Sequence, residues 1–513
     1  MQKDIEITIA PENVANQQLI LQNLAKALKV DLNSINSFKI LKRSIDARSR
    51  KVIYRLQIRA YLNELAPQLE SKLVYPSVAD KKPVIIVGAG PAGLFAALQC
   101  IEIGLKPIVV ERGKDVKQRR RDLAAINKQG LVNTESNYCY GEGGAGTYSD
   151  GKLYTRSNKR GDINKVLQIF VQHGADEDIL IDARPHIGTN KLPHIITAIR
   201  ETIINAGGQV LFDAKLTDII IENDKVKGIV VNNQQEFLAD DVILATGHSA
   251  RDIYELLHKK NILLEAKPFA LGVRIEHPQQ VIDSAQYHCD VRSEFLPPAY
   301  YSMVEQVKTR GVFSFCMCPG GIIAPCATDL NEIVVNGWSP SKRNNPFANS
   351  GTVVQITLDD VPGTDPLRML DFQNSIEKKA FQAGGGNLVA PAQRMVDFVE
   401  GRLSADLPKN SYLPGTKSVM LEDVLPDFVA TSLKAALPLF GKKMRGYYSN
   451  DAILVGVESR TSSPVRIPRD KETFQHPQIQ GLYPCAEGAG YAGGIVSAAI
   501  DGVNCANAIL NKI

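Results

Sequence analysis

The sequence predicts an α/β protein in which a parallel nucleotide-binding sheet is interrupted by a mixed α+β region and preceded by a small βαββ domain. Three observations predict this fold. A buried strand, a glycine turn and a helix follow one another at residues 83–104, and a similar unit occupies residues 481–509. Residues 267–447, between these units, mix strand and helix patterns. This arrangement is typical of a discontinuous α/β domain that carries an insertion.

The first unit, PVIIVGAGPAGLFAALQCIEIGLKPIVVE, contains a G-x-G-x-x-G motif at Gly88, Gly90 and Gly93. These glycines permit a tight turn, close approach of the backbone to a pyrophosphate, and close packing of the helix on the strand. Pro91 suits the first turn of a helix whose N-terminal amides attract an anion. The next strand ends in Glu111, at the spacing of an acid that binds a ribose hydroxyl. This Rossmann-like unit predicts an adenine dinucleotide site; a packing turn without a ligand is the alternative.

The composition is that of an ordinary globular enzyme. The chain has 513 residues, of which 44% are hydrophobic and 22% charged, and a net charge of +4. No apolar run reaches the roughly 18 residues of a membrane span, and the first residues lack a secretory signal pattern. We therefore expect a soluble, cytoplasmic protein. The eight cysteines show no C-x-x-C pair or zinc spacing, so we expect neither a metal site nor a disulfide framework.

Residues 1–80 form the predicted N-terminal domain. A helix is expected at residues 16–28, and strands are expected at residues 5–9, 37–45 and 52–61. A linker is expected at residues 65–82. The domain holds 12 Lys and Arg against 8 Asp and Glu. Its basic hairpin favours either docking to RNA or an acidic protein, or a solvated surface whose long side chains cover apolar groups. The basic residues of the hairpin are Lys39, Lys42, Arg43, Arg48, Arg50, Lys51, Arg55 and Arg59.

A second glycine-rich segment, NYCYGEGGAGTYSDGKL at residues 137–153, has neither the strand nor the helix of a nucleotide site. We expect a loop whose backbone closely approaches a flat ring. A helix at residues 192–206 precedes short antiparallel strands with a turn at residues 223–224. This β-meander would place Leu216 against an adenine, and the returning strand would bring three residues beside the first glycine loop: Ala245, Thr246 and Gly247.

The C-terminal unit contains a third G-x-G-x-x-G, at Gly488, Gly490 and Gly493, but no room follows for a second strand and ribose acid. We therefore expect it to complete the first site. The predicted boundaries are residues 1–80 for the N-terminal domain, 81–266 and 451–513 for the two parts of the nucleotide-binding domain, and 267–450 for an inserted substrate domain.

The chain also contains GEGGAGTYSDGKL, GHSARD, FCMCPGG, SRTSSPVRI and GLYPCAEGAGYAGGIVSAAIDG. Together with the first glycine loop, these motifs resemble a bacterial family of FAD-dependent dehydrogenases whose substrate is unassigned. The likeness covers nearly the whole chain. More distantly, the layout is similar to p-hydroxybenzoate hydroxylase and fumarate reductase flavoproteins. The resemblance implies a discontinuous Rossmann-like FAD-binding domain with a β-meander and an inserted mixed α+β domain.

The resemblance also implies a distributed FAD site. Glu111 would hold the adenosine ribose, and Arg119, or else Arg112, would reach the phosphates. Glu487 would bind a ribityl hydroxyl, although many flavoproteins have a shorter Asp there. The helix beginning near residue 494 would stabilise negative charge near flavin N1 and the C2 carbonyl. The other implied contacts are Gly88, Gly90, Pro91, Ala92, Gly93, Gly143, Gly144, Gly146, Ser149, Asp150, Gly488, Gly494, Ile495 and Val496.

Two sets of polar side chains are candidates for proton transfer and substrate binding. His248 follows the Thr-Gly turn and would either donate a proton near the cofactor or hold a backbone carbonyl. Arg274 and His277 would clamp an anionic substrate. Alternatively, Arg274 would form an ion pair with Glu276, which lies on the same face of its strand.

Alternation places Cys316 and Cys318 on one side of a strand, either as a catalytic dithiol or as inert buried thiols. The leading hypothesis is an FAD-dependent oxidoreductase that passes a hydride through flavin N5 to or from a small molecule. NAD(P)H would be a transient electron donor. The alternatives are a flavoprotein that docks to RNA or an acidic partner through the N-terminal domain, and a non-catalytic FAD-binding protein.

Overall fold

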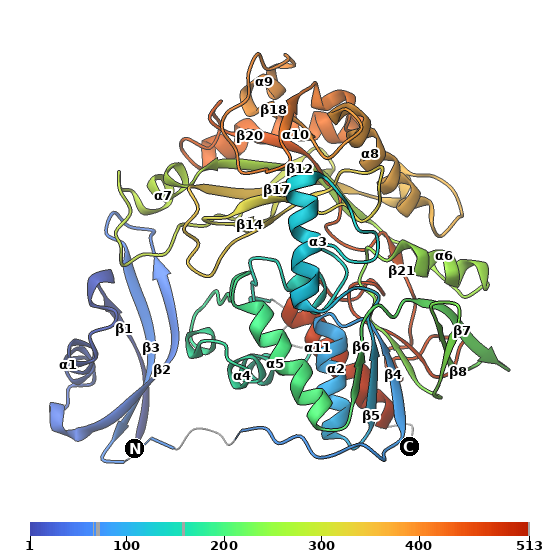
Figure 1. Ribbon diagram of the computed structural model, residues 1–513. Helices are drawn as coiled ribbons and strands as arrows, with labels where there is room; N and C mark the ends of the chain where they lie inside the picture. Colours follow the sequence, from blue (N-terminus) through green and yellow to red (C-terminus); the bar gives the residue numbers. More distant parts are fainter. Residues whose placement is uncertain (65, 68–71, 156–159, 511–513) are drawn as a thin grey trace.

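The computed structural model describes residues 1–64, 66–67, 72–155 and 160–510. Figure 1 shows a small N-terminal domain beside two larger layers, with the parallel sheet below and the inserted region above. Residues 65 and 68–71 of the predicted linker lie outside the described residues. Within the described segments, no helix is both long enough and apolar enough to cross a membrane.

The N-terminal domain has the βαββ order that the sequence predicts. Its antiparallel sheet has the strand order β1-β3-β2, and α1 packs against β1 and β2. The Asn16 side chain accepts a hydrogen bond from the Leu19 amide and so caps α1. The elements are β1 (Gln2–Ile9), α1 (Gln17–Leu28), β2 (Ile35–Asp46) and β3 (Ile53–Leu62).

The nucleotide-binding sheet has five parallel strands in the order β22-β10-β4-β5-β6. Four of the five β4 residues are buried, as a central strand covered on both faces requires. One face shares a core with three helices, α2 (Pro91–Glu102), α5 (Leu192–Asn205) and α11 (Ile495–Leu510). The strands are β4 (Pro83–Val87), β5 (Lys106–Val110), β6 (Gln209–Leu211), β10 (Val242–Leu244) and β22 (Leu482–Pro484).

The carboxyl ends of the central strands lie at one level. Val87 at the end of β4 pairs with Val110 of β5 and Leu244 of β10, and Leu244 pairs with Pro484 of β22. The chain runs from β4 to β5 on one side and returns to β10 on the other, so β4 is a topological switch point. Ligands of open α/β sheets bind beyond the carboxyl ends of the strands at such a point.

The β-meander covers the opposite face of this sheet together with α6 (Arg251–Lys259). Asn223 and Asp224 have φ angles of 50° and 60°, as a two-residue hairpin turn requires. The structure corrects one detail: residues 209–211 are β6, which pairs in parallel with β5 instead of joining the antiparallel strands. The meander is therefore β7 (Leu216–Glu222), β8 (Lys225–Val231) and β9 (Gln235–Leu238).

The inserted region is built on a seven-stranded mixed sheet in the order β13-β14-β17-β12-β20-β18-β19. The last of these strands in the chain, β20, lies beyond residue 450, where the sequence predicts the end of the insertion. A separate hairpin pairs β15 (Ile322–Pro325) with β16 (Val335–Trp338). The sheet strands are β12 (Phe269–Pro278), β13 (Val304–Val307), β14 (Arg310–Cys318), β17 (Phe347–Ile356), β18 (Ala390–Arg394), β19 (Thr416–Ser418) and β20 (Ile453–Glu458).

Helices cover the upper side of the inserted sheet in Figure 1, while α3 runs between the two layers. The short pair of β11 (Glu265–Ala266) and β21 (Val465–Arg466) joins the two regions where the chain leaves and re-enters the insertion. The remaining α-helices are α3 (Val116–Gln129), α4 (Ile163–Gln172), α7 (Gln279–Tyr287), α8 (Arg368–Gly384), α9 (Met395–Glu400) and α10 (Asp427–Lys443).

Candidate functional site

A cavity extends from the carboxyl edge of the parallel sheet to the near side of the inserted region. Its first wall is the glycine loop after β4. Gly88 has φ +104°, and a Cβ there would lie 2.4 Å from Ala245 O, so a side chain has no room. Gly90 precedes α2 without a side-chain cap, and this leaves the first amides of the helix available to an anion.

Glu111 lines the cavity and also holds its loops together. Its Oε2 accepts a hydrogen bond from the Ala89 amide at 2.8 Å. Its Oε1 accepts from the Gly113 amide at 2.9 Å and the Gly141 amide at 2.8 Å. One carboxylate therefore joins three backbone segments, a structural role that the ribose interpretation did not include.

The structure separates the two candidate arginines. Arg112 lines the cavity, where its guanidinium stacks 4.3 Å from the ring centre of Tyr140 and pairs with Asp252. Arg119, our first choice for the phosphates, is fully buried and does not line the cavity. Its guanidinium donates to three backbone carbonyls, those of Asn137, Tyr138 and Glu142. Arg119 therefore shapes the second glycine segment from behind.

The second glycine segment lies between the two helix N-termini. A Cβ at Gly144 would lie 3.1 Å from Gly90 Cα, and one at Gly146 would lie 3.3 Å from the Ile495 side chain. Gly143 itself does not line the cavity; a Cβ there would lie 1.8 Å from Thr147 Oγ1. The segment thus brings bare backbone to the middle of the cavity, as a loop that approaches a flat ring requires.

The third wall is the turn before α11. Glu487 Oε1 accepts a hydrogen bond from the Gly494 amide at 2.6 Å, and Oε2 lies 3.4 Å from His248 Nδ1. Burial raises the pKa of Glu487, but His248 and the Gly494 amide outweigh it, and the net shift is downward. The backbones at Gly247 and Gly494 are left-handed and border open space, so a side chain at either position would enter the cavity.

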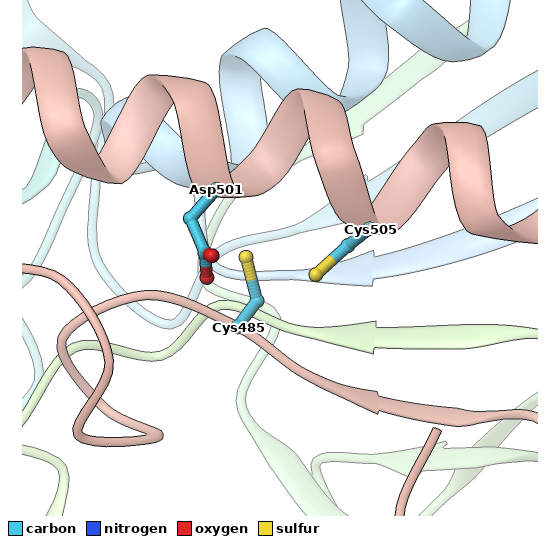
Figure 2. Close-up of side chains that lie close together, drawn as sticks. All are labelled: Cys485, Asp501 and Cys505. Atoms are coloured by element: carbon cyan, nitrogen blue, oxygen red, sulfur yellow. The ribbon is translucent and has the colours of Figure 1, made fainter. Parts of the chain in front are cut away.

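Behind this turn lies a buried cluster that the sequence analysis missed (Figure 2). Cys485, Asp501 and Cys505 point toward one another with their ligand atoms within 4.8 Å. Arg469 supplies the positive charge there: its guanidinium binds both Asp501 oxygens at 2.6 and 2.8 Å. Asp501 also accepts a hydrogen bond from the amide of Ala486, which has φ +56°. The Arg469–Asp501 pair therefore fixes the turn that presents Glu487.

The wall from the inserted region contains side chains from several segments. Cys316 and Trp338 line it together with Lys152, which lies near the end of the second glycine segment. Lys152 Nζ lies 3.7 Å from Cys316 Sγ and 3.8 Å from Cys318 Sγ. Cys318 is buried and does not line the cavity. The sequence grouped the two cysteines but gave no signal for the lysine, which is 164 positions from Cys316.

The predicted clamp of Arg274 and His277 is wrong, because both side chains are fully buried and neither lines the cavity. The predicted ion pair of Arg274 with Glu276 is also wrong. Arg274 Nη1 binds both carboxylate oxygens of Glu458 at 3.0 Å, a partner 184 positions away on the adjacent strand β20.

Glu276 and His277 have separate structural roles. Glu276 accepts hydrogen bonds from the Ser411 amide and hydroxyl. His277 Nε2 lies 2.7 Å from Tyr447 O. Burial lowers the pKa of His277 to about 4, so it is neutral at pH 7.

Comparisons with known proteins agree with a flavin-binding fold. Residues 83–120 match the model of an FAD binding domain, and residues 268–461 match that of the FAD-dependent protein, C-terminal domain-like family. Residues 1–61 match a domain of unknown function. An uncharacterized protein of Clostridium beijerinckii is 40% identical over 512 residues, covering 96% of this chain and 95% of that protein. The chain belongs to this family of FAD-dependent proteins.

Other relatives match only part of the chain. The thiamine thiazole synthase of Aeropyrum pernix is 26% identical over 33% of this chain and 56% of that protein. The NADH:fumarate oxidoreductase of Klebsiella pneumoniae is 24% identical over 32% of this chain and 20% of that protein. A glycine oxidase structure from Bacillus cereus covers 85% of this chain and 96% of that chain at 13% identity. Its TM-score of 0.31 is too low to bear on the site.

FAD is thus the cofactor of this flavoprotein, and the cavity fits it. Near the first glycine loop, the cavity is lined by glycine backbone that leaves no room for side chains. Near the turn before α11, the left-handed glycines Gly247 and Gly494 border open space. Most of the proposed FAD contacts line the cavity; the exceptions are Gly93, Arg119, Gly143, Gly488 and Val496. Gly93 and Gly488 act by packing, because a Cβ there would lie 1.9 Å from Gly88 O and 2.7 Å from Gly247 O, respectively.

In the part of the chain that the structure describes, four of the eight basic residues of the N-terminal hairpin have carboxylate partners. Arg43 binds Asp178 and Asp182 of the FAD-binding region, both at 2.7 Å. Three further arginines have carboxylate partners in their own domain: Arg48 and Arg55 bind Asp46, Arg55 also binds Glu6, and Arg59 binds Asp4. These pairs favour the solvated, structural interpretation of the hairpin over a docking surface for RNA or an acidic protein.

Proposed function

We propose that this flavoprotein is a dehydrogenase or reductase that exchanges a hydride between FAD and a small molecule bound against the inserted region. One observation carries the proposal: a single continuous cavity has glycine-rich FAD walls at one end and polar side chains of the inserted region at the other. FAD supplies the two-electron chemistry when bound, while the protein positions and tunes it.

Each wall of the cavity would contact a different part of FAD, beginning with the first glycine loop. The N-terminus of α2, with Gly88, Gly90 and Ala92, would hold the pyrophosphate, and Arg112 would lie beside it. Glu111 would accept from the adenosine ribose with the lone pairs that its backbone amides leave free. Leu216, which lines the cavity from β7, would contact the adenine.

The flavin end would be held by the second glycine segment and by α11. Gly144, Gly146 and Ser149 line this part of the cavity, as do Gly494 and Ile495. The positive end of the α11 dipole would stabilise negative charge on the reduced cofactor. His248 Nδ1 lies 3.4 Å from the Glu487 carboxylate at this end. His248 would hold the Glu487 carboxylate toward the Gly494 amide and exchange a proton near the reacting atoms.

Anaerobic reduction of the purified holoprotein by NADH or by NADPH tests this function. Loss of the visible flavin absorbance with either nucleotide would support a pyridine-nucleotide oxidoreductase. If neither nucleotide bleaches the flavin, NAD(P)H is not the donor, and electrons must come from the small molecule itself. Anaerobic reduction of the oxidised holoprotein by electron-donating small molecules then tests the substrate half of the proposal.

A further inference from the structure

A cluster of charges behind the inserted wall contains one more cation than carboxylates. Arg343 binds Asp150 through Nε at 3.0 Å and Nη2 at 2.5 Å. Arg274 binds both oxygens of the buried Glu458. Each arginine is thus neutralised by its own carboxylate. Among the carboxylates of the described residues, Lys152, the third cation, has one partner within 4 Å, and this is Asp150 at 3.9 Å, which Arg343 already binds.

Among the described residues, two thiols are the hydrogen-bond partners of the Lys152 ammonium. Cys316 Sγ and Cys318 Sγ lie 3.7 and 3.8 Å from Nζ, closer than the Asp150 carboxylate. The Lys152 side chain is 34% exposed, and a bound cofactor would exclude more water from it. A cation removed from water requires an anion, and ionisation of one thiol supplies it.

Geometry distinguishes the two thiols. Cys316 lines the cavity, whereas Cys318 is fully buried behind it. A β-bulge between Phe315 and Cys318 interrupts the pairing of β14 with β17, and Cys316 has φ +47°. This conformation is costly for a residue with a Cβ and marks functional sites when the surroundings enforce it. Arg274 enforces it here by donating to Cys316 O at 2.8 Å.

The interactions of the pair favour ionisation of Cys316. The Cys318 thiol, Lys152 and Arg274 lower the pKa of Cys316 against the opposing effect of burial. The same thiol–thiol contact, with burial, raises the pKa of Cys318. His186, also near this cluster, adds no charge at pH 7, because burial and Arg343 lower its pKa to about 4. These interactions favour the thiolate at the cavity-facing sulfur, and the buried Cys318 thiol keeps a hydrogen-bond acceptor for its proton in Cys316 O at 3.3 Å.

We propose that Cys316 and Cys318 form a redox-active dithiol in which Lys152 holds Cys316 as the thiolate, and that this dithiol exchanges two electrons with the bound FAD. On oxidation, a bond forms between the two sulfurs, and the Cys318 S–H bond breaks. Two electrons and one proton leave for FAD, the two-electron acceptor. The reverse transfer reduces the disulfide. This proposal requires bound FAD but does not depend on the hydride donor or the small molecule of the proposed function.

An electron count tests the couple. Holoprotein is treated with the thiol oxidant diamide, desalted and titrated anaerobically with dithionite while the flavin absorbance is recorded. We expect about four electrons per FAD for the wild type and about two for Cys318→Ser, because a disulfide takes two. Cys505→Ser is the matched control, because Cys485 and Cys505 are neighbouring thiols that do not line the cavity. A wild-type count of about two, or a loss of two electrons in Cys505→Ser instead, would overturn the proposal.

The thiolate is tested separately from the electron count. The rate of alkylation by iodoacetamide is measured against pH at each cysteine of the holoprotein by peptide mass spectrometry. Cys316 should titrate well below the ordinary thiol pKa of about 8.5, and Lys152→Met should raise its midpoint. Cys326 is an internal control in the same cavity, where burial raises the thiol pKa. A Cys316 midpoint at or above about 8.5 in the wild type would contradict the role of Lys152.

Discussion

The two ends of the cavity are built by different means. At the FAD end, the backbone forms the surface, and the decisive feature is the absence of side chains at Gly88, Gly90 and Gly144. At the inserted end, side chains such as Lys152 and Cys316 form the surface, and the buried pair of Arg274 and Glu458 lies behind it. In both pairs the partners come from segments far apart in the sequence. The FAD end depends on available space, whereas the inserted end depends on charge balance.

This difference implies two kinds of sensitivity to mutation. A surface made of backbone should lose its shape and its ligand when a single methyl group enters a space that cannot expand. A side-chain surface fails when one member of a charge pair is lost, and it recovers when both members are replaced together. The following predictions test this contrast, beginning with the largest expected effect.

Gly93→Ala should abolish FAD loading and reduce the unfolding free energy by more than about 4 kcal/mol, at the upper end for single substitutions. The new Cβ would lie 1.9 Å from the backbone atom Gly88 O. The Cβ is bonded directly to the α2 backbone, so neither atom can move away without a shift of the main chain. Urea unfolding and the ratio of flavin to protein absorbance measure the two effects.

Gly104→Ala, just beyond the other end of α2, is the matched control. Gly104 has φ +77°, but no atom lies within 4 Å of the position of a new Cβ. The variant should lose only about 1–2 kcal/mol from the left-handed backbone and keep its FAD. Equal losses in the two variants would show that the protein relieves the contact at Gly93, and that available space does not determine the sensitivity of the FAD end.

The FAD end was also the more predictable. The first glycine loop, its helix and Glu111 are close in sequence, so spacing alone indicated their roles. Sequence analysis failed where a local motif has a distant partner. Arg119 is near the loop in sequence, but its guanidinium binds carbonyls of residues 137–142. Asp501 fixes Ala486 through a salt bridge with Arg469 that no local spacing reveals.

Arg274→Met should reduce the unfolding free energy by about 3–5 kcal/mol, because it leaves the Glu458 carboxylate buried and unpaired. Arg274 and Glu458 are 0% and 2% exposed, so water cannot replace the lost partner. The double variant Arg274→Met, Glu458→Met should recover most of the loss. Urea unfolding of the two single variants and the double variant measures the coupling. If the double variant is as unstable as the sum of the single variants, charge balance does not control this wall.

The inserted end was poorly predicted because strand alternation identifies a face but not the partner on the neighbouring strand. Arg274 and Glu276 do lie on alternate positions of β12, yet antiparallel pairing with β20 brings Glu458 next to Arg274. The order of the strands is set by the whole sheet. The sequence alone therefore favoured the pair of Arg274 with Glu276, because it did not reveal that β20 lies beside β12. The bulge that turns Cys316 toward the cavity is also a property of the pairing between β14 and β17.

The smallest expected effect concerns Asp150, where the two ends of the cavity meet. Burial raises the pKa of this carboxyl, but Arg343 and Lys152 outweigh it and lower the pKa from its ordinary value of 3.8 to about 2. Because the pKa is depressed in the folded state, the stabilisation is fully present above pH 3.8 and is lost as the pH falls to about 2. The difference in unfolding free energy between wild type and Asp150→Asn should therefore shrink by about 2 kcal/mol across that window. Urea unfolding of both proteins at pH values from 5 to 2 measures it. A difference that stays constant would mean that hydrogen-bond geometry, and not the ionised carboxylate, joins the second glycine segment to the inserted wall.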